Sequence, residues 1–187
     1  MKKQRIAALL LFIFLPGACA SLPHAADPKS GPEQRFSFEH PSEWERMNTQ
    51  RYLIFTKDGA FSQYILIQER PIHKAFRHTK RRFTRDMLPQ ETAEVIVDEI
   101  SSDRSVLHFR ILENGPATVG GIDGFRLVFT YKSKDGRPFK TVYYGCLQGA
   151  WFYSIRYNAD ERHFCTGDID TLERILGSFR IAPSGEA

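Results

Sequence analysis

Hydrophobic and polar residues alternate over most of the chain between residues 36 and 157. Short runs rich in aromatic and β-branched residues, separated by turn residues, are typical of β-strands. Seven such runs occur: FSFEH at 36–40, RYLIFTK at 51–57, YILIQER at 64–70, SVLHFRIL at 105–112, GFRLVFTYK at 124–132, PFKTVYYGCL at 138–147 and AWFYSIRY at 150–157. Lys134-Asp135-Gly136 and Gln148-Gly149 predict tight hairpin turns, because glycine readily adopts a positive φ. The C-terminal half is therefore predicted to form an antiparallel meander.

Two segments have helical periodicity instead. Residues 89–100 begin with proline, which suits the first helical position, and apolar residues recur there with i, i+3, i+4, i+7 spacing. Residues 168–177 begin with acids, which suit the positive end of a helix dipole. The apolar stripes consist of Ala93, Ile96, Val97 and Ile100 in the first helix, and of Ile169, Leu172, Leu176 and Phe179 in and just after the second.

The predicted sheet is apolar on both faces. Alternate residues of the strand at 124–132 place four aromatic or aliphatic side chains on one face, and the strand at 150–157 does the same. Such a sheet needs cover on both sides, which predicts an α+β fold: an antiparallel β-sheet flanked by helices in an α/β/α sandwich. The residues concerned are Phe125, Leu127, Phe129 and Tyr131, then Trp151, Tyr153, Ile155 and Tyr157, with Val128, Val142 and Tyr144 on opposite faces.

The first 18 residues are typical of a bacterial secretory signal. MKKQR is basic, and the ten apolar residues from Ile6 to Leu15 are too few to span a bilayer. In LPGACASLP, a lipoprotein peptidase would cut before Cys19, whereas an ordinary signal peptidase would use Ala18-Cys19-Ala20 and cut before Ser21. We expect the first, with Cys19 lipidated. The predicted segments are a signal peptide at 1–18, a lipidation site with flexible tether at 19–34, a folded domain at 35–182 and a tail at 183–187.

The three cysteines are an odd number for an exported chain. If Cys19 carries the lipid, Cys146 and Cys165 are left as an even pair in an oxidising compartment. We therefore expect a disulfide between them, with two buried thiols as the alternative.

Positive charge is concentrated in one segment. The formal net charge of +4 falls to +1 without the signal, which gives no support for nucleic-acid binding. KAFRHTKRRFTR at 74–85 nevertheless has six basic residues and no acid. If helical, it would align Phe76, Phe83 and Met87 on one side and Arg77, Arg81 and Arg85 on another. It could bind anionic lipid, an acidic protein or a polyanionic glycan, or form a solvated loop edge; the candidate residues are Lys74, Arg77, Lys80, Arg81, Arg82 and Arg85.

The sequence contains no catalytic signature, and we expect a non-enzymatic protein without cofactor or metal. VGGIDG at 119–124 precedes a strand and not a helix, so it predicts a turn and not a phosphate loop. His163, Cys165 and Cys146 lack the spacing of a zinc site or of an activated thiol. Five clustered aromatics predict either core or an exposed groove for a ligand: Tyr143, Tyr144, Trp151, Phe152 and Tyr153.

Four motifs together resemble PsbP-like domains: FSFEHPSEW at 36–44, GGIDGFRLVFTY at 120–131, GAWFYSIRY at 149–157 and LERILGSF at 172–179. The resemblance covers residues 35–182 and implies the PsbP-like α/β/α sandwich. That superfamily includes an extrinsic photosystem subunit, a Ran-binding nuclear import factor and many bacterial envelope lipoproteins of unassigned role. It implies binding or assembly without catalysis, and no functional residue transfers, because these motifs supply turn and core positions: Pro41, Trp44, Gly120, Gly121, Gly124, Ser178 and Phe179.

We therefore expect a lipid-anchored envelope protein that binds another envelope component, at the periplasmic face of a membrane. The alternatives are a soluble periplasmic protein that binds a small ligand and, third, a hydrolase. An exposed basic surface favours the first. A pocket with convergent polar groups favours the second, and a nucleophile beside a base favours the third.

Overall fold

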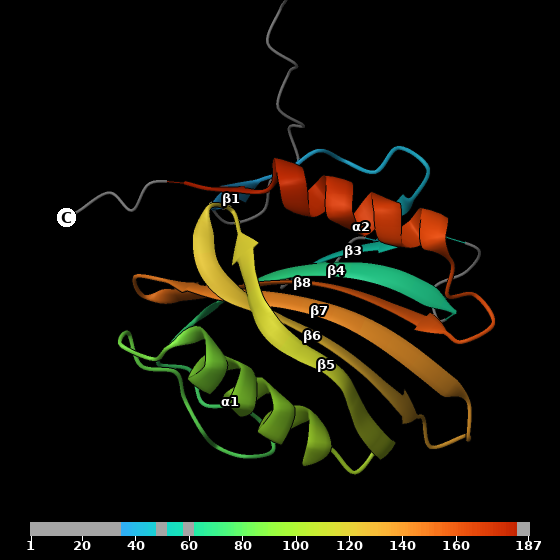
Figure 1. The fold of residues 1–187 in the computed structure, drawn as a ribbon, viewed down its shortest axis with the longest axis horizontal. Helices are drawn as coiled ribbons and strands as arrows, with labels where there is room; N and C mark the ends of the chain where they lie inside the picture. Colours follow the sequence, from blue (N-terminus) through green and yellow to red (C-terminus); the bar gives the residue numbers. More distant parts are fainter. Residues whose placement is uncertain (1–34, 48–51, 58–61, 183–187) are drawn as a thin grey trace, which may run out of the picture. The chain divides into compact units, whose positions relative to one another are not determined.

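An antiparallel sheet with one helix on each face makes up the domain (Figure 1). The computed structural model describes residues 35–47, 52–57 and 62–182, which all belong to one compact unit. Within these residues the main sheet has seven strands in the order β2-β3-β4-β8-β7-β6-β5. Their bounds are β2 Glu45–Met47, β3 Leu53–Thr56, β4 Gln63–Pro71, β5 Leu107–Val119, β6 Ile122–Lys132, β7 Pro138–Gln148 and β8 Trp151–Asp160. The predicted α+β class and the C-terminal meander are confirmed.

The bounds of several strands differ from those predicted. The run at 36–40 supplies only β1 Phe36–Ser37, which pairs with the short β9 Arg180–Ile181 in a separate two-stranded sheet. Neither β2 nor β9 was predicted, because two or three residues are too few to show periodicity. Strand β5 continues to Val119, past polar residues and two register shifts that break its alternation.

Two hydrophobic clusters lie on opposite faces of the main sheet. Helix α1 Pro89–Ser101 covers one face and helix α2 Thr166–Ser178 covers the other (Figure 1). Neighbouring residues of one strand enter different clusters: Leu127 packs on the α1 side and Val128 on the α2 side. The two-sided apolar sheet predicted from alternation is confirmed.

The glycines at 120 and 121 form the turn between β5 and β6. Both have positive φ, +60° at Gly120 and +84° at Gly121. A two-residue hairpin loop of this kind requires positive φ at its central positions. The prediction of a turn at VGGIDG is confirmed.

The basic segment at 74–85 is not helical, so the side-chain alignment considered for a helix does not occur. Its two phenylalanines are buried in the α1-side cluster, Phe76 against Phe83 and Phe83 against Phe152, with ring centroids 5.1 and 4.5 Å apart. The backbone N–H of Phe76 donates to the carbonyl oxygen of Arg81 at 2.8 Å and closes the loop. We call residues 74–85 the basic loop.

Among the described residues, neither helix has an apolar stretch of the length that a membrane span needs.

Candidate functional site

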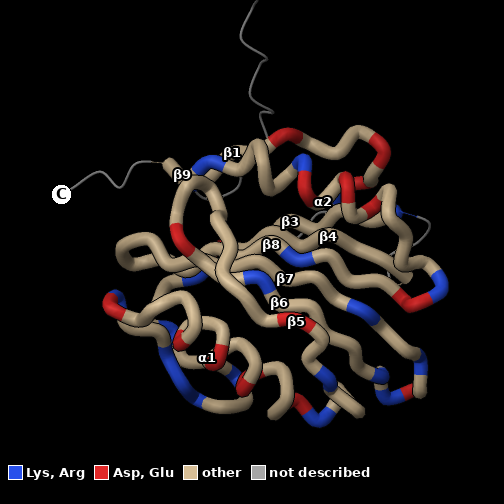
Figure 2. Tube along the Cα trace, in the orientation of Figure 1, with Lys and Arg blue, Asp and Glu red and all other residues tan. Residues whose placement is uncertain are grey.

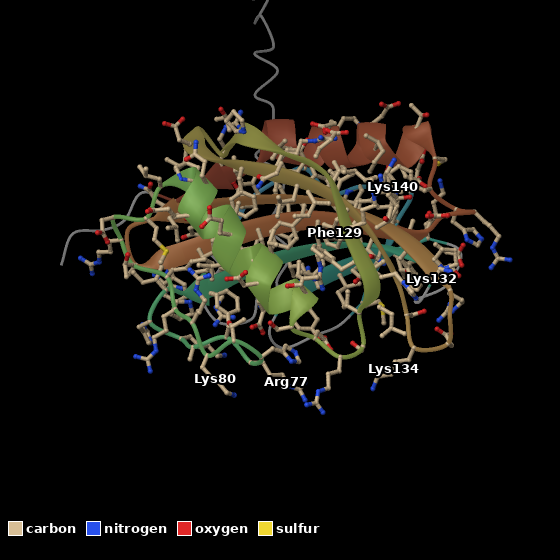
Figure 3. The ribbon with its side chains drawn as sticks, turned by 60° about the horizontal axis from the view of Figure 1, so that its bottom comes forward. Arg77, Lys80, Phe129, Lys132, Lys134 and Lys140 are labelled. Carbon is tan, nitrogen blue, oxygen red and sulfur yellow. The ribbon has the colours of Figure 1, made fainter. Side chains whose placement is uncertain are left out.

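The basic loop displays its charges outward while its phenylalanines hold it to the sheet. All six candidate cations are exposed: Lys74, Arg77, Lys80, Arg81, Arg82 and Arg85. Arg77 and Lys80 project from the outer edge of the loop (Figure 3). Within the described ranges, Arg81 is the one cation of the six that forms an ion pair, with Asp98 of α1. The structure thus gathers the candidates on one ordered loop.

Glu99 of α1 holds the loop in place. Its carboxylate accepts hydrogen bonds from the backbone N–H groups of Arg77, His78 and Thr79 at 2.9 to 3.1 Å. Burial opposes the charge of Glu99, but these bonds and that from the Thr79 hydroxyl outweigh it and lower the pKa of the carboxyl below its ordinary value. Glu99 lies outside the apolar stripe of α1, and the fold uses it to order the loop.

The acids of α1 form a negative strip beside the positive loop. Figure 2 shows the red positions of α1 next to the blue positions of the loop. Glu91 and Glu94 are exposed, and Glu91 accepts a hydrogen bond from the Leu88 N–H at 2.8 Å. The surface around the loop therefore presents both signs of charge in a fixed pattern.

A pocket of about 230 Å³ lies beneath the C-terminal end of α1. Its floor is the sheet, and its roof is formed by the end of α1, the segment that follows α1, and His78 of the basic loop. We call it the polar pocket. The floor residues come from four strands: Tyr64 of β4, Phe129 and Tyr131 of β6, Thr141 of β7, and Arg156 and Asn158 of β8.

Hydrogen bonds on the floor fix the side chain of Asn158. The hydroxyl groups of Tyr131 and Thr141 both donate to Asn158 Oδ1, at 3.1 and 2.7 Å. Burial raises the pKa of the Tyr131 hydroxyl to about 12, so this donor keeps its proton at neutral pH. No hydrogen bond from the amide nitrogen of Asn158 is found among the described residues, so this group can donate to a ligand.

Arg156 has no carboxylate partner. Among the described residues its guanidinium forms no ion pair, and its buried Nε atom has no hydrogen-bond partner. The guanidinium lies over the ring of Tyr64, 5.6 Å from the centroid. Arg156 is partly buried, and arginines that are removed from water are ordinarily paired, so Arg156 is a functional candidate that the sequence analysis missed.

A more open hollow of about 410 Å³ lies at the other end of α1, beside the β5–β6 hairpin. Three of the residues that line it are glycines: Gly121, Gly124 and Gly145. The polar pocket is smaller, but it holds the buried guanidinium atom that lacks a partner.

The aromatic groove that the sequence left open does not form. Tyr143 and Phe152 are buried on the α1 side, and Tyr144 and Tyr153 are buried on the α2 side. Trp151 packs against the α2-side cluster, and the guanidinium of Arg35 covers its ring 4.0 Å from the centroid. Strand alternation divides the aromatics between two cores, so they share no surface.

The structure does not support a disulfide between Cys146 and Cys165; both are free thiols. Cys146 pairs with Tyr153 across β7 and β8, whereas Cys165 donates to Asp168, which also binds the Tyr157 hydroxyl. Tyr153 and Tyr157 are four residues apart on β8, about 13 Å along a strand. Disulfides require a Cα separation below about 7 Å.

The predicted lipidation site Cys19, the predicted signal peptide at 1–18 and the predicted tether at 19–34 fall outside the described residues. Within residues 35–47, 52–57 and 62–182, no three His, Cys, Asp or Glu side chains gather in a way that could hold a metal ion. His163 instead contributes its carbonyl oxygen, which accepts a hydrogen bond from the Tyr157 hydroxyl at 3.3 Å.

Comparisons with known proteins give matches in structure alone. No family model matches the chain, and no curated protein matches its sequence. Cyanobacterial PsbP (CyanoP) from Synechocystis sp. PCC 6803 aligns over 88% of this chain and 98% of its own, with a TM-score of 0.54 at 11% identity. This confirms the PsbP-like fold.

Two further structures are similar. A protein from Bacteroides thetaiotaomicron VPI-5482 aligns over 81% of this chain, with a TM-score of 0.50 at 13% identity, and the chain spans 47% of its length. LpqN, described as involved in cell envelope biogenesis of Mycobacterium tuberculosis, aligns over 85% of this chain and 88% of its own, with a TM-score of 0.49 at 14% identity.

Proposed function

Because the chain has a PsbP-like fold behind a lipoprotein-like leader, we propose that it is a lipid-anchored envelope protein that acts by binding another envelope component. It carries out no catalysis in this role. A lipid on Cys19 holds it at the membrane, and the basic loop is the surface that contacts the partner. LpqN, which is described as involved in envelope biogenesis, is consistent with such a location.

The observation that carries this proposal is the anchoring of the basic loop. Two buried phenylalanines and the carboxylate of Glu99 hold the loop, and neither contact neutralises a cationic side chain. An ordered loop pays less conformational entropy on binding than a mobile one. Exposed cations on a fixed backbone therefore suit specific contact with an acidic surface.

The charge pattern favours a protein partner over a lipid surface. An anionic bilayer attracts each nearby cation by about 1 kcal/mol, but it repels acids that approach with them. Glu91 and Glu94 are exposed on α1. The acidic positions of α1 lie next to the basic positions of the loop (Figure 2), so they would approach the same bilayer. A protein with an acidic patch next to a basic one would match both signs.

The tether sets the distance from the membrane at which the domain would work. Residues 19–34 are rich in proline and polar residues. If these residues form the flexible tether that their composition predicts, their r.m.s. end-to-end distance is about 20 Å. The domain would thus meet partners that lie within a few nanometres of the bilayer.

Crosslinking in native membranes tests the proposal. The variant Arg77→Glu/Arg82→Glu/Arg85→Glu reverses three exposed cations for which no side-chain ion pair is found within the described residues, and it leaves the Arg81–Asp98 pair intact. We expect at least a tenfold loss of the crosslinked partner relative to the unaltered protein. Capture should also fall as salt rises, because exposed charges are screened.

The matched control reverses three exposed cations elsewhere: Arg110→Glu/Lys132→Glu/Lys134→Glu. It makes the same change in net charge. The amount of crosslinked partner should stay within twofold of that captured by the unaltered protein. Equal loss in both variants would refute a role for the loop. Binding to anionic vesicles that is abolished by the loop variant, without any crosslinked protein, would identify a lipid surface and refute the protein partner.

A further inference from the structure

The polar pocket holds the most unusual charge in the domain. Arg156 lies on β8, which is central in the sheet with β4 on one side and β7 on the other. Its Nε atom is buried without a partner, and no carboxylate among the described residues pairs with the guanidinium. Arg156 is partly buried, and a cation that loses hydration without gaining a counter-ion is costly for folding. Its presence beside a cavity indicates a group that binds something.

The free polar groups of the pocket are donors. Arg156 and Asn158 are two residues apart on one strand, so their side chains project from the same face. The acceptor Oδ1 of Asn158 is occupied by the Tyr131 and Thr141 hydroxyl groups, and within the described residues the amide nitrogen has no hydrogen-bond partner. A ligand that presents acceptors can therefore bind both of these donors.

The two acids in the lining already have partners. Glu99 accepts bonds from the N–H groups of the basic loop. Asp103 accepts from the N–H and hydroxyl of Ser105 at 2.8 and 2.7 Å, and it pairs with His78 at 3.5 Å. These carboxylates serve to hold the roof, while the uncommitted donors lie on the floor.

The walls restrict the kind of anion. Tyr64, Phe129, Tyr131 and the roof residues Ile100 and Val106 present rings and aliphatic groups. Phosphate sites combine several cations or a run of backbone N–H groups, whereas this floor offers one guanidinium and one amide. A planar carboxylate can take two hydrogen bonds from such a pair.

We propose that the polar pocket binds the carboxylate of a small organic acid with an apolar or aromatic body, and that Arg156 and Asn158 donate to the carboxylate. The pocket volume of about 230 Å³ limits the body to about one ring. This site is separate from the cations of the basic loop, so it can exist whether or not the loop binds a partner.

Binding of 4-fluorobenzoate to the purified full chain, followed by fluorine NMR, tests the proposal. The matched probe 4-fluorobenzamide has the same ring but no charge. We expect the acid to bind at least tenfold more tightly than the amide. Inorganic phosphate at the same concentration should not displace the acid.

Variants assign the binding to Arg156. Arg156→Gln should weaken binding of 4-fluorobenzoate at least tenfold, and Arg156→Lys should retain part of it because the cation remains. Arg174→Gln removes an exposed arginine from α2, on the opposite face of the sheet, and should leave binding unchanged. Circular dichroism establishes that each variant is folded.

Several results would overturn the inference. These are no binding of the acid, equal binding of acid and amide, displacement by phosphate, or full affinity in a folded Arg156→Gln variant. Should that variant fail to fold, the comparison of acid and amide on the unaltered chain still decides the question.

Discussion

The two cysteines of the domain look equivalent in the sequence but have different surroundings in the fold. Cys146 is 1% exposed and its Sγ lies 3.7 Å from the carbonyl oxygen of Val119. Burial raises the pKa of its thiol to about 12. Cys165 is exposed, directly before α2. Because the thiolate is the reactive form, only the second cysteine should react in the native protein.

Alkylation followed by peptide mapping checks this difference. In native protein at pH 8 we expect iodoacetamide to modify Cys165 and to leave Cys146 unmodified. In denatured protein that has not been reduced, both should be modified. A peptide pair joined through Cys146 and Cys165 would show instead that the disulfide forms.

The single residue Arg156 shows why polar positions on a central strand are informative. Phe152, Ser154, Arg156 and Asn158 alternate with the apolar residues of β8. At the edge of a sheet such a row would face water, but β8 has neighbours on both sides and α1 covers this face. Arg156 is a functional candidate because it lies on a central strand at a covered face, and its residue type alone would not indicate this.

Helix α1 and the basic loop form one unit. Five residues of α1 are buried or packed in the cluster that also contains Phe76 and Phe83: Ala93, Val95, Ile96, Val97 and Ile100. The opposite side of the helix supplies Glu99 and Asp98 to the loop. The amphipathic pattern of α1 thus serves the core with one face and orders the loop with the other.

Replacing Glu99 with glutamine tests this coupling. We expect the backbone amides of Arg77, His78 and Thr79 to exchange at least tenfold faster with solvent in Glu99→Gln. An amide oxygen is a weaker acceptor than a carboxylate, and the replacement also introduces two donors. Glu94→Gln, an exposed position on the same helix, is the control and should not change the exchange.

The same contact predicts a dependence on pH. The pKa of Glu99 is lower in the folded protein than its ordinary value. The stabilisation is therefore fully present above the unfolded pKa of about 4.3 and is lost as the pH falls through the folded pKa. Protection factors of the loop amides should fall in this acid range in the unaltered protein and stay constant in Glu99→Gln. Protection that is independent of pH in both would contradict the assignment.

The two clusters of the domain depend on the same strands. Strands β6, β7 and β8 each place alternate residues in each cluster, as Tyr143 and Tyr144 do in β7. Loss of one cluster would uncover one face of these strands, and the other cluster is built on the opposite face of the same strands. The domain should therefore unfold as one cooperative unit, although its apolar residues form two separate groups.

Denaturant unfolding checks this with two probes. Trp44 and Trp151 both belong to the α2-side cluster, so their fluorescence reports that face alone. Circular dichroism reports both helices and the sheet. We expect coincident midpoints, and a fluorescence transition separated from the dichroism transition would show that the two faces unfold independently.

Local patterns carried most of the fold prediction. Alternation and helical spacing depend on neighbouring residues, so seven of the strands and both helices could be predicted from the sequence, with the largest errors at β1 and β5. The basic loop was identified by its composition, but the helix considered for this segment does not form. Its Phe83 contacts Phe152 of β8, across almost seventy residues of the chain, and no local pattern contains such a contact.

Most of the strands, both helices, the two-sided sheet and the concentration of charge follow from the sequence, because period and composition are local properties of the chain. The central position of β8, the separation of Cys146 from Cys165, and the meeting of Tyr64, Tyr131 and Arg156 in one pocket depend on the folded structure. The physical reason is that strand order is set by the packing of the whole sheet. Residues distant along the chain become neighbours only when that packing is complete.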